Sequence, residues 1–396
     1  MPRAPLPGVR GAAPAEAGDS AERVKPKAAH ALRVAVLYND DAERLEIGEA
    51  QDRIAVASAK WAAEAIARAL VDVGREVRQV PVRGDAALVA RGLERGGFDV
   101  VFNVCEGFAG RSRLEAHVAS LLELLGLPYT GSPPLALALC QDKVRAKAVL
   151  AASGVRVADG AALSSAVGPL PAALRYPVIV KTRFEDASHG IADASVCADE
   201  AALRARAAYL IERYRQDAIV EAFLPGREFN VSVLGNDPPL VLPLSEIDFS
   251  GLPAGAPPLV TYEAKWVPES VYYEKTPVRC PARVEPGLRA RVEATALAAY
   301  EALGCRDYAR IDVRLDAAGE PVVLEVNPNP DISPTGGLVT TAKSPIGPDD
   351  GCPHWRPLAY ERLIERILGF AIERGAGSAP GPRRRPARAA RGPARD

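Results

Sequence analysis

Short apolar runs alternate with amphipathic segments along the first third of the chain. Residues 32–38 and 98–104 are mostly apolar, which is typical of buried strands, and polar residues follow the first run at Asn39. Residues 50–73 place apolar side chains at helical spacing and end before Gly74, which predicts a helix. The same two patterns recur at 75–82, 85–95, and 113–125. This alternation predicts a parallel sheet covered by helices.

The pattern changes further along the chain. After Pro134 a single helix is predicted to run to Ala152, and residues 175–182 then form a buried strand. From residue 218 onward, apolar runs separated by Pro-Gly and Asn-Asp-Pro turns predict several strands. A helix over 286–303, a pair of strands and a last helix over about 356–373 follow. We therefore predict an α/β protein with three lobes, at 31–142, 143–220 and 221–374.

The composition is that of a globular protein. A length of 396 residues corresponds to two or three domains. With 48% apolar and 25% charged residues, disorder of the whole chain is excluded. The 49 Lys and Arg nearly cancel the 50 Asp and Glu, so no net field attracts nucleic acid or an anionic membrane. Residues 1–30 and 375–396 lack periodicity and are predicted to be disordered tails, the second an Arg-rich, solvated end rather than a nucleic-acid-binding arm.

Cysteine usage and hydropathy favour a cytoplasmic protein. The six cysteines are widely separated and form no Cys-x-x-Cys pair, so they indicate neither a disulfide scaffold nor a zinc site. The longest apolar runs are far shorter than the roughly 20 residues that span a bilayer. The first thirty residues lack the apolar segment of a signal peptide. We therefore expect a cytoplasmic location without membrane contact.

The strongest chemical signal is a predicted hairpin formed by residues 309–316 and 321–331. A four-residue loop would pair Asp316 with Pro321 and so place Asp312 opposite Glu325. Arg310 would then lie opposite Asn327. Facing carboxylates repel each other unless a cation lies between them, and an oxygen-only ligand set suits Mg²⁺ completed by water and nucleotide phosphates. The alternative is a solvent-exposed face with splayed carboxylates. It is disfavoured because the intervening residues Ile311, Val313, Leu324 and Val326 are apolar and are expected to lie on the opposite, buried face.

Two further segments carry weaker signals. Lys181 emerges from a buried strand just before a loop of small residues, where an ammonium group and backbone N–H groups could approach phosphates. Lys143 and Lys147 lie one helical turn apart and, on their own, indicate a solvated helix face. Glu221 and Glu228 flank a Pro-Gly turn where a ribose and an adenine could hydrogen-bond, but on its own this segment favours an exposed hairpin with charged rims.

Several further segments accompany these signals along the chain. In order, the whole set is VFN-x-CEG (101–107), LLGLPYTGS (124–132), LCQDKVRAK (139–147), YPVIVK (176–181), EDAS-x-G (185–190), EAFLPGREF (221–229), YEAKW (262–266), CPA (280–282), ARIDVRLD (309–316) and LEVNP-x-P (324–330). Taken together and in this order, these segments resemble the D-alanine–D-alanine ligase family of ATP-grasp enzymes. The resemblance covers about residues 33–374.

The resemblance implies the ATP-grasp fold, in which a Rossmann-like N-terminal domain precedes two α+β lobes that clamp ATP. It implies roles for a set of residues: phosphate contacts from Lys143 and Lys181; a phosphate-covering flap with Glu185, Ser188 and Gly190; an adenine and ribose segment of Glu221, Ala222, Phe223, Leu224 and Glu228; Mg²⁺ (or Mn²⁺) ligands Asp312, Glu325 and Asn327; and catalytic groups Arg310 and Lys265. Lys265 would lie on a mobile loop that supplies its ammonium to the transferred phosphoryl group.

The implied activity is an ATP-dependent carboxylate–amine ligase that acts through an acyl phosphate and takes a small carboxylate and a small amine. The open alternatives are a genuine D-alanine–D-alanine ligase, an ATP-grasp kinase or a ligase with a non-amine nucleophile, and a non-catalytic ATP-binding regulator. The full set of metal ligands and lysines argues against the last. Family likeness favours a homodimer.

The substrate segments of the family are not retained. LYNDD (37–41) and CEGFAG (105–110) replace the family's N-terminal glycine-rich segment and its His-Gly loop. Asp331 stands where a glycine is expected, and Gly336 where a carboxylate-binding serine is expected. We therefore assign Asp331 and Gly336 to the substrate region and expect substrates other than two D-alanines.

Overall fold

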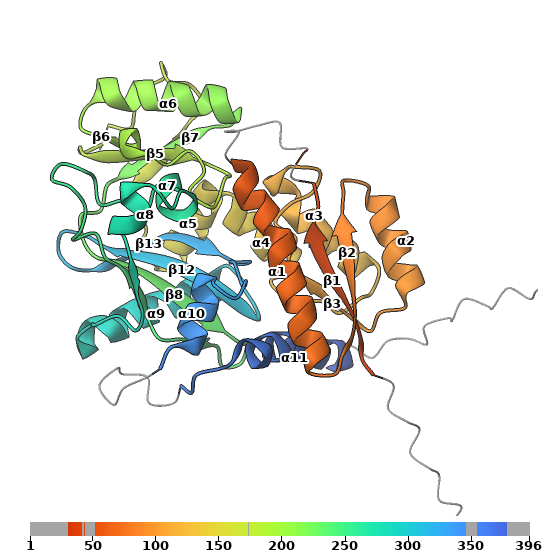
Figure 1. Cartoon of the computed structure of the whole chain (residues 1–396). Helices are drawn as coiled ribbons and strands as arrows, with labels where there is room; N and C mark the ends of the chain where they lie inside the picture. The colour runs from red at the N-terminus through yellow and green to blue at the C-terminus, as the bar shows by residue number, and fades with distance from the viewer. Residues whose placement is uncertain (1–30, 42, 44–51, 173, 346–354, 378–396) are drawn as a thin grey trace, which may run out of the picture. The chain divides into compact units, whose positions relative to one another are not determined.

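A parallel three-stranded sheet forms the first part of the structure, a computed structural model that describes residues 31–41, 43, 52–172, 174–345 and 355–377. Its strands β1 (Arg33–Asn39), β2 (Glu76–Val82) and β3 (Val100–Asn103) lie in the order β2-β1-β3 (Figure 1). The helices between and after them are α1 (Asp52–Asp72), α2 (Ala86–Gly96), the 3₁₀ turn η2 (Ser112–Leu114) and α3 (Glu115–Leu124). The predicted alternation of strands and helices is confirmed.

The predicted helix from Pro134 to Ala152 is two helices, α4 (Pro134–Gln141) and α5 (Lys143–Ala152). Asp142 separates them in an extended conformation and accepts hydrogen bonds from the backbone N–H groups of Val144 and Arg145. The prediction was wrong here because Asp142, between Gln141 and Lys143, acts as a side-chain N-cap that starts a new helix. The break places Lys143 at the first turn of α5 rather than in the middle of a helix.

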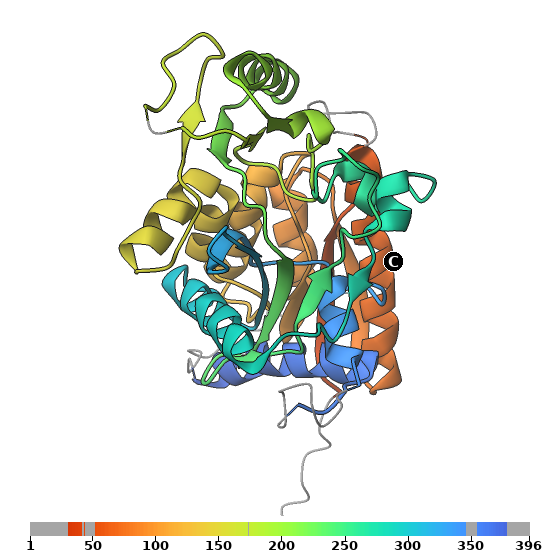
Figure 2. The same ribbon diagram turned by 90° about the vertical axis from the view of Figure 1, so that its left-hand side faces the viewer.

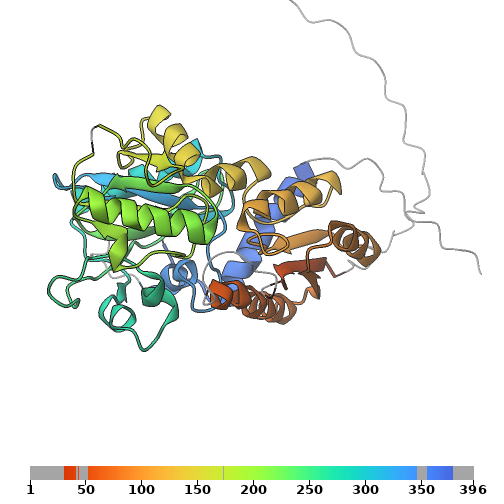
Figure 3. The same cartoon turned by 90° about the horizontal axis from the view of Figure 1, so that it is seen from above.

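A second sheet is antiparallel, with the order β4-β7-β5-β6. Its strands are β4 (Gly160–Leu163), β5 (Val178–Thr182), β6 (Val196–Cys197) and β7 (Ala218–Ala222), with η3 (Asp193–Ser195) and α6 (Glu200–Tyr214) between them. Helix α6 covers one face, where Leu203 and Leu210 pack against Val178 and Val180 (Figure 3). Because side chains alternate along a strand, Ile179 and Lys181 project from the opposite face.

The third sheet has the order β11-β10-β8-β12-β13, with β9 paired to β8. Its strands are β8 (Glu228–Leu234), β9 (Leu240–Val241), β10 (Ser245–Ile247), β11 (Val278–Arg279), β12 (Tyr308–Leu315) and β13 (Pro321–Asn327). The helices of this region are α7 (Tyr262–Trp266), α8 (Val271–Lys275), α9 (Pro286–Ala302) and α10 (Gly337–Lys343). Helix α9 lies against the sheet, and its Val292 and Ala296 share one core with Val231 and Ile311 (Figure 2).

The β12–β13 hairpin has the predicted central pairing but a different turn. Asp312 lies opposite Glu325 and Arg310 opposite Asn327, as predicted. The loop has one residue more than expected, since Leu315 rather than Asp316 pairs with Pro321, and a register shift next to Asp312 compensates for it. This irregularity breaks the alternation of β13, so Leu324 lines the same pocket as Glu325. The expectation that Leu324 points to the opposite face was therefore wrong.

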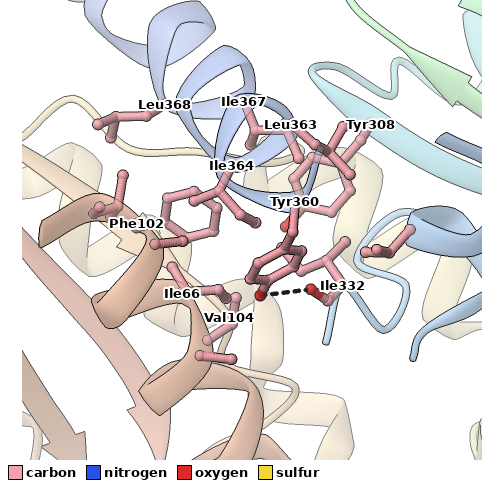
Figure 4. Close-up of a cluster of buried hydrophobic side chains, with 14 of the residues drawn as sticks. Ile66, Phe102, Val104, Tyr308, Ile332, Tyr360, Leu363, Ile364, Ile367 and Leu368 are labelled. Carbon is pink, nitrogen blue, oxygen red and sulfur yellow. Dashed lines mark hydrogen bonds between the residues drawn. The ribbon is translucent and has the colours of Figure 1, made fainter. Parts of the chain in front are cut away.

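The last helix, α11 (Tyr360–Gly377), packs against the first sheet and its helix α1. Its buried Leu363, Ile364 and Ile367 share one hydrophobic core with Ile66 and Phe102 (Figure 4). A segment near the end of the chain thus packs into a core that the first lobe shares with residues of the third, such as Tyr308 and Ile332. The helix also includes residues 375–377, which had been predicted to belong to the disordered tail; the rest of both predicted tails lies outside the described residues.

The three sheets fall in the three predicted sequence ranges, apart from Glu221 and Ala222, which still belong to the second sheet. We propose to keep these ranges as the limits of the lobes, with α11 assigned by packing to the first. Across the described part of the chain, no helix combines the length and the apolar character that a membrane span requires.

Candidate active site

A pocket of about 950 Å³, open to solvent, lies between the second and third sheets. Its apolar part includes Ile179, Phe223, Leu224, Leu259 and Leu324. Its polar part gathers charged side chains of both signs from both sheets. The site residues predicted from the sequence that line this pocket are Lys143, Lys181, Glu185, Ser188, Glu221, Ala222, Phe223, Leu224, Glu228, Lys265, Arg310, Asp312 and Glu325. Gly190, Asn327, Asp331 and Gly336 are outside the lining.

The carboxylates of the hairpin are each paired with cations. Arg310 donates two hydrogen bonds to Asp312, from Nε to Oδ1 at 2.7 Å and from Nη2 to Oδ2 at 2.9 Å. Asn230 donates to the same Oδ1 at 2.8 Å, and Asn327 donates to Oδ2 at 3.3 Å. The amide of Asn327 therefore lies beside Asp312, although Asn327 itself is not part of the pocket wall.

Glu325 faces a group of cations. Its Oε2 lies 3.8 Å from the Nζ of Lys143. Burial by itself would raise the pKa of Glu325, but Lys143 and Lys181 hold this pKa well below its usual range, with further contributions from Lys265 and Arg310. Glu325 is therefore a carboxylate at neutral pH despite its surroundings.

Glu221 bridges two lysines, one of which the sequence had not assigned to the site. Its Oε1 lies 3.1 Å from the Nζ of Lys147, and its Oε2 lies 3.0 Å from the Nζ of Lys181. Burial lowers the pKa of Lys147, and the neighbouring Lys181 lowers it further. The prediction that Lys143 and Lys147 form a solvated helix face was therefore wrong. A lysine at helical spacing gives no local sign of burial, because the partner that permits it comes from another element.

Glu228 and Arg314 form a buried pair at the end of the pocket that is nearest the Pro-Gly turn. The Nη1 of Arg314 donates to the Oε2 of Glu228 at 3.0 Å. The guanidinium lies over the rings of Phe223 and Phe249, with 5.0 and 5.3 Å to their centroids. Burial raises the pKa of Glu228 to about 7, since the attraction of Arg314 offsets only part of the desolvation.

Residues 185–191 form a loop, here called the flap, that is anchored at both ends. The side chain of Glu185 accepts hydrogen bonds from Gln216 at 2.8 Å and from Ser112 at 3.2 Å. The indole of Trp266 donates to the carbonyl of Ala187 at 3.2 Å. Gly190 has φ of +70°, and a Cβ there would lie 2.9 Å from Tyr214, which explains a glycine at that position.

Lys265 lies on the short helix α7, next to the flap contact of Trp266, rather than on an irregular loop. Its side chain lines the pocket. Burial lowers the pKa of Lys265, and Arg310 lowers it further. Three lysines and one arginine therefore converge on the hairpin carboxylates.

The predicted substrate residues are engaged in the turn before α10. The Asp331 carboxylate accepts hydrogen bonds from the backbone N and the Oγ of Ser333, at 2.8 and 3.0 Å. A Cβ on Gly336 would lie 2.4 Å from the carbonyl oxygen of Asp331, so a serine does not fit this turn. Asn329 is bound internally as well, because it donates to Glu115 and to the carbonyl of Cys105, both at 3.0 Å.

The segments that replace the family's substrate loops are joined to each other. Asn39 donates to the carbonyl of Gly107 at 3.0 Å and accepts from the backbone N of Glu106 at 2.8 Å. Asp41 accepts from the backbone N of Gly110 at 3.1 Å. Loss of hydration among the surrounding protein atoms raises the pKa of Glu106, and repulsion from Asp331 and Asp186 raises it further. The residue nevertheless stays solvent-accessible.

The donor set of the hairpin fits a hard divalent cation. Asp312, Glu325 and Asn327 offer only oxygen ligands, and Mg²⁺ commonly takes one or two carboxylates and completes its shell with water and phosphates. No group of three or more His, Cys, Asp or Glu side chains suited to a metal ion occurs within the described ranges. A metal site here would therefore depend on phosphate oxygens as well as on protein.

Comparison with known proteins agrees with this geometry. The family model "D-ala D-ala ligase C-terminus" matches residues 158–344. A D-alanine–D-alanine ligase of Synechococcus sp. (strain JA-3-3Ab) is 33% identical over 81% of this chain and 93% of its own length. An uncharacterized protein of Sinorhizobium fredii, y4sG, is 37% identical over 70% of this chain and 76% of its own. The crystal structure of the Bacillus anthracis D-alanine–D-alanine ligase complexed with ATP superposes with a TM-score of 0.65 at 20% identity, over 88% of this chain and 99% of that one.

Two α+β lobes with a cation-rich pocket between their sheets define an ATP-grasp ligase, a class of enzymes that form carbon–nitrogen bonds. The curated relatives narrow this class. The chain belongs to the D-alanine–D-alanine ligase family.

Proposed function

We propose that this ligase uses Mg-ATP to join a small carboxylate to a small amine through an acyl phosphate, with substrates other than two D-alanines. The observation that carries the proposal is the convergence of Lys143, Lys181, Lys265 and Arg310 on one pocket that also has apolar walls. A nucleoside triphosphate has both an apolar base and about four negative charges, so it complements both parts of such a pocket.

The proposed roles combine the family resemblance with the positions of most of these residues in the pocket. Lys143 and Lys181 would contact the phosphates, beneath the flap of residues 185–191. Phe223 and Leu224 would hold the adenine, and Glu228 would accept hydrogen bonds from the ribose. Further site members from the sequence prediction are Glu185, Ser188 and Gly190 on the flap and Glu221 and Ala222 beside the base.

Asp312, Glu325 and Asn327 would hold Mg²⁺, which when bound neutralises phosphate charge and orients the triphosphate. Mn²⁺ has the same preference for oxygen ligands. Arg310 would neutralise charge on the transferred phosphoryl group, assisted by Lys265. The fixed geometry of Arg310, which its two bonds to Asp312 hold, supports this role because a pre-oriented cation needs no reorganisation during transfer.

The chemistry has two steps. A carboxylate oxygen attacks the γ-phosphorus and ADP leaves, which gives an acyl phosphate. The nitrogen of the amine then attacks the acyl carbon, inorganic phosphate leaves, and the nitrogen loses a proton. The closed flap would exclude water, which otherwise hydrolyses the acyl phosphate.

The substrate proposal rests on the rebuilt segments around Glu106, Asp331 and Gly336. The turn after Pro330 has no room for a serine side chain at position 336, and a carboxylate occupies position 331. We propose an acceptor with a positive or hydrogen-bond-donating group in place of a second D-alanine. A pocket built for one charged group disfavours ligands that lack its partner.

The test is ADP release from Mg-ATP with a panel of amino acids and small carboxylates, followed by mass spectrometry of the product. Asp312→Asn and Glu325→Gln are expected to abolish the Mg²⁺-dependent signal. Glu320→Gln, on the loop of the same hairpin and exposed, is the matched control and should retain activity. Full activity of the Glu325 variant would refute the metal assignment. D-alanyl-D-alanine formation at ~1 s⁻¹ or faster would refute the substrate proposal and identify a genuine D-alanine–D-alanine ligase.

A further inference from the structure

The phosphate-binding lysine of the proposed site already has partners from the protein. The side chain of Lys143 is only 5% exposed. Its Nζ donates to the backbone carbonyl of Glu185 at 2.5 Å and to the carboxylate of Asp186 at 3.2 Å. Burial would lower the pKa of Lys143, but Asp186 and Glu325 outweigh this and raise it. The ammonium group is thus fully charged and satisfied without a nucleotide.

Asp186 is held in this position by the flap. The preceding residue, Glu185, is anchored to Gln216 and Ser112, and the following residue, Ala187, is anchored by Trp266. The carbonyl of Asp186 accepts the backbone N–H of His189 at 3.0 Å, which closes a turn. Its side chain lines the pocket and is 45% exposed. The carboxylate is therefore directed at Lys143 while it stays accessible to a ligand.

We propose that Asp186 competes with the nucleotide, because its carboxylate occupies Lys143 until the phosphates displace it. This inference rests on the proposed function, in which Lys143 contacts phosphate. Both anions need the same buried ammonium group, and a phosphate carries more charge and more acceptor oxygens than a carboxylate. A ligand without phosphates does not enter this exchange, so the competition weakens the binding of phosphate-bearing ligands and leaves the binding of nucleosides unchanged.

The experiment is calorimetric titration of Mg-ATP, with adenosine as the phosphate-free probe, into the full chain and its variants. Asp186→Asn should bind Mg-ATP about two- to fivefold more tightly, the effect of removing a partly exposed ion pair that competes with the ligand. Its affinity for adenosine should not change. Glu200→Gln, which removes a carboxylate from a surface pair on the same lobe, is the matched control and should alter neither affinity.

A double-mutant cycle distinguishes competition at Lys143 from general repulsion of the nucleotide. In a Lys143→Gln background, or Lys143→Met if the former does not fold, Asp186→Asn should give no gain in Mg-ATP affinity. Three results would each overturn the inference. They are a gain in Mg-ATP affinity that persists in the Lys143 background, a gain in adenosine affinity, and Mg-ATP binding by the single variant that is unchanged or weaker.

The two proposals fail in different ways. Binding of Mg-ATP by the wild type with no gain in Asp186→Asn overturns only the competition. The expected gain without ADP release for any substrate pair overturns the proposed reaction and leaves the competition standing. No binding of Mg-ATP by either protein overturns both.

Discussion

Replacing Glu221 by glutamine should destabilise the ligand-free protein strongly and in a pH-dependent manner. Glu221 is only 3% exposed and its carboxylate is shared by Lys147 and Lys181 at 3.1 and 3.0 Å. The amide of Glu221→Gln keeps the shape of the side chain but removes the charge. Two buried ammonium groups then lie close together without their direct ion-pair partner, and only the more distant carboxylate of Glu325 still attracts them.

The expected loss in the free energy of unfolding is set by the lowest-energy way to relieve this repulsion. Removing one partner of a buried ion pair costs about 3–5 kcal/mol. A lysine can instead lose its proton, and at pH 7.5, about three units below its ordinary pKa, this costs about 4 kcal/mol. Both routes give a loss of about 4 kcal/mol in the free energy of unfolding, with the second as an upper limit.

The pH dependence has a definite sign. In the variant the pKa of one lysine is depressed in the folded state, so the unfolded chain binds more protons than the folded one. Stability then rises with pH, by up to about 1.4 kcal/mol per unit. The variant should therefore regain stability relative to the wild type between pH 7.5 and pH 9.

The assay is urea unfolding of the wild type, Glu221→Gln and Glu221→Gln/Lys147→Met at both pH values. The double variant removes one of the two unpaired cations and should recover much of the loss. Glu200→Gln, whose carboxylate is 59% exposed, should lose less than about 1 kcal/mol. A loss below about 1 kcal/mol for Glu221→Gln, independent of pH, would refute the reasoning that its carboxylate neutralises both lysines.

Three further outcomes are expected. Burial raises the pKa of Glu228 to about 7 from 4.5, so the folded state binds an extra proton between these pH values and the free energy of unfolding should fall as pH rises from about 4.5 to 7. Glu228→Gln should flatten this slope in urea unfolding, and an unchanged slope would contradict the pKa assignment. Ile364→Ala should lower the free energy of unfolding by about 2–5 kcal/mol, since Ile364 is fully buried where α11 packs against the first lobe. A loss below about 1 kcal/mol would show that this packing contributes little to stability. Gly336→Ala should lower the free energy of unfolding by about 1–3 kcal/mol, because its Cβ would lie 2.4 Å from the carbonyl oxygen of Asp331. Gly337→Ala is the control and should be neutral, since a Cβ there has no atom within 4 Å. Equal melting temperatures for both variants would count against the turn geometry.

Local pattern was enough to predict the elements and part of the site. The alternating strands and helices of the first lobe are confirmed because burial of one face leaves a periodicity in the sequence itself. The pairing of Asp312 with Glu325 was also predictable, since two strands joined by a short turn can pair in few registers. The family resemblance then identified the pocket residues by their order along the chain.

Features that leave no mark in the apolar pattern could not be predicted. The break at Asp142 follows from a side-chain cap, and the extra loop residue of the hairpin is compensated by an irregularity that no local pattern marks. The assignment of α11 to the first lobe depends on which core it completes, and its own amphipathic pattern is compatible with any apolar surface.

The charged residues of the site also show what could and what could not be predicted from the sequence. The sequence by itself determined which ionisable side chains are present and on which elements they lie. Only the tertiary structure decided that Lys147 is buried against Glu221 and that Asp186 holds Lys143. The physical reason is that a buried charge is stable only beside an opposite charge. For these two lysines of α5 the opposite charge comes from strand β7 or from the flap, more than forty residues away along the chain.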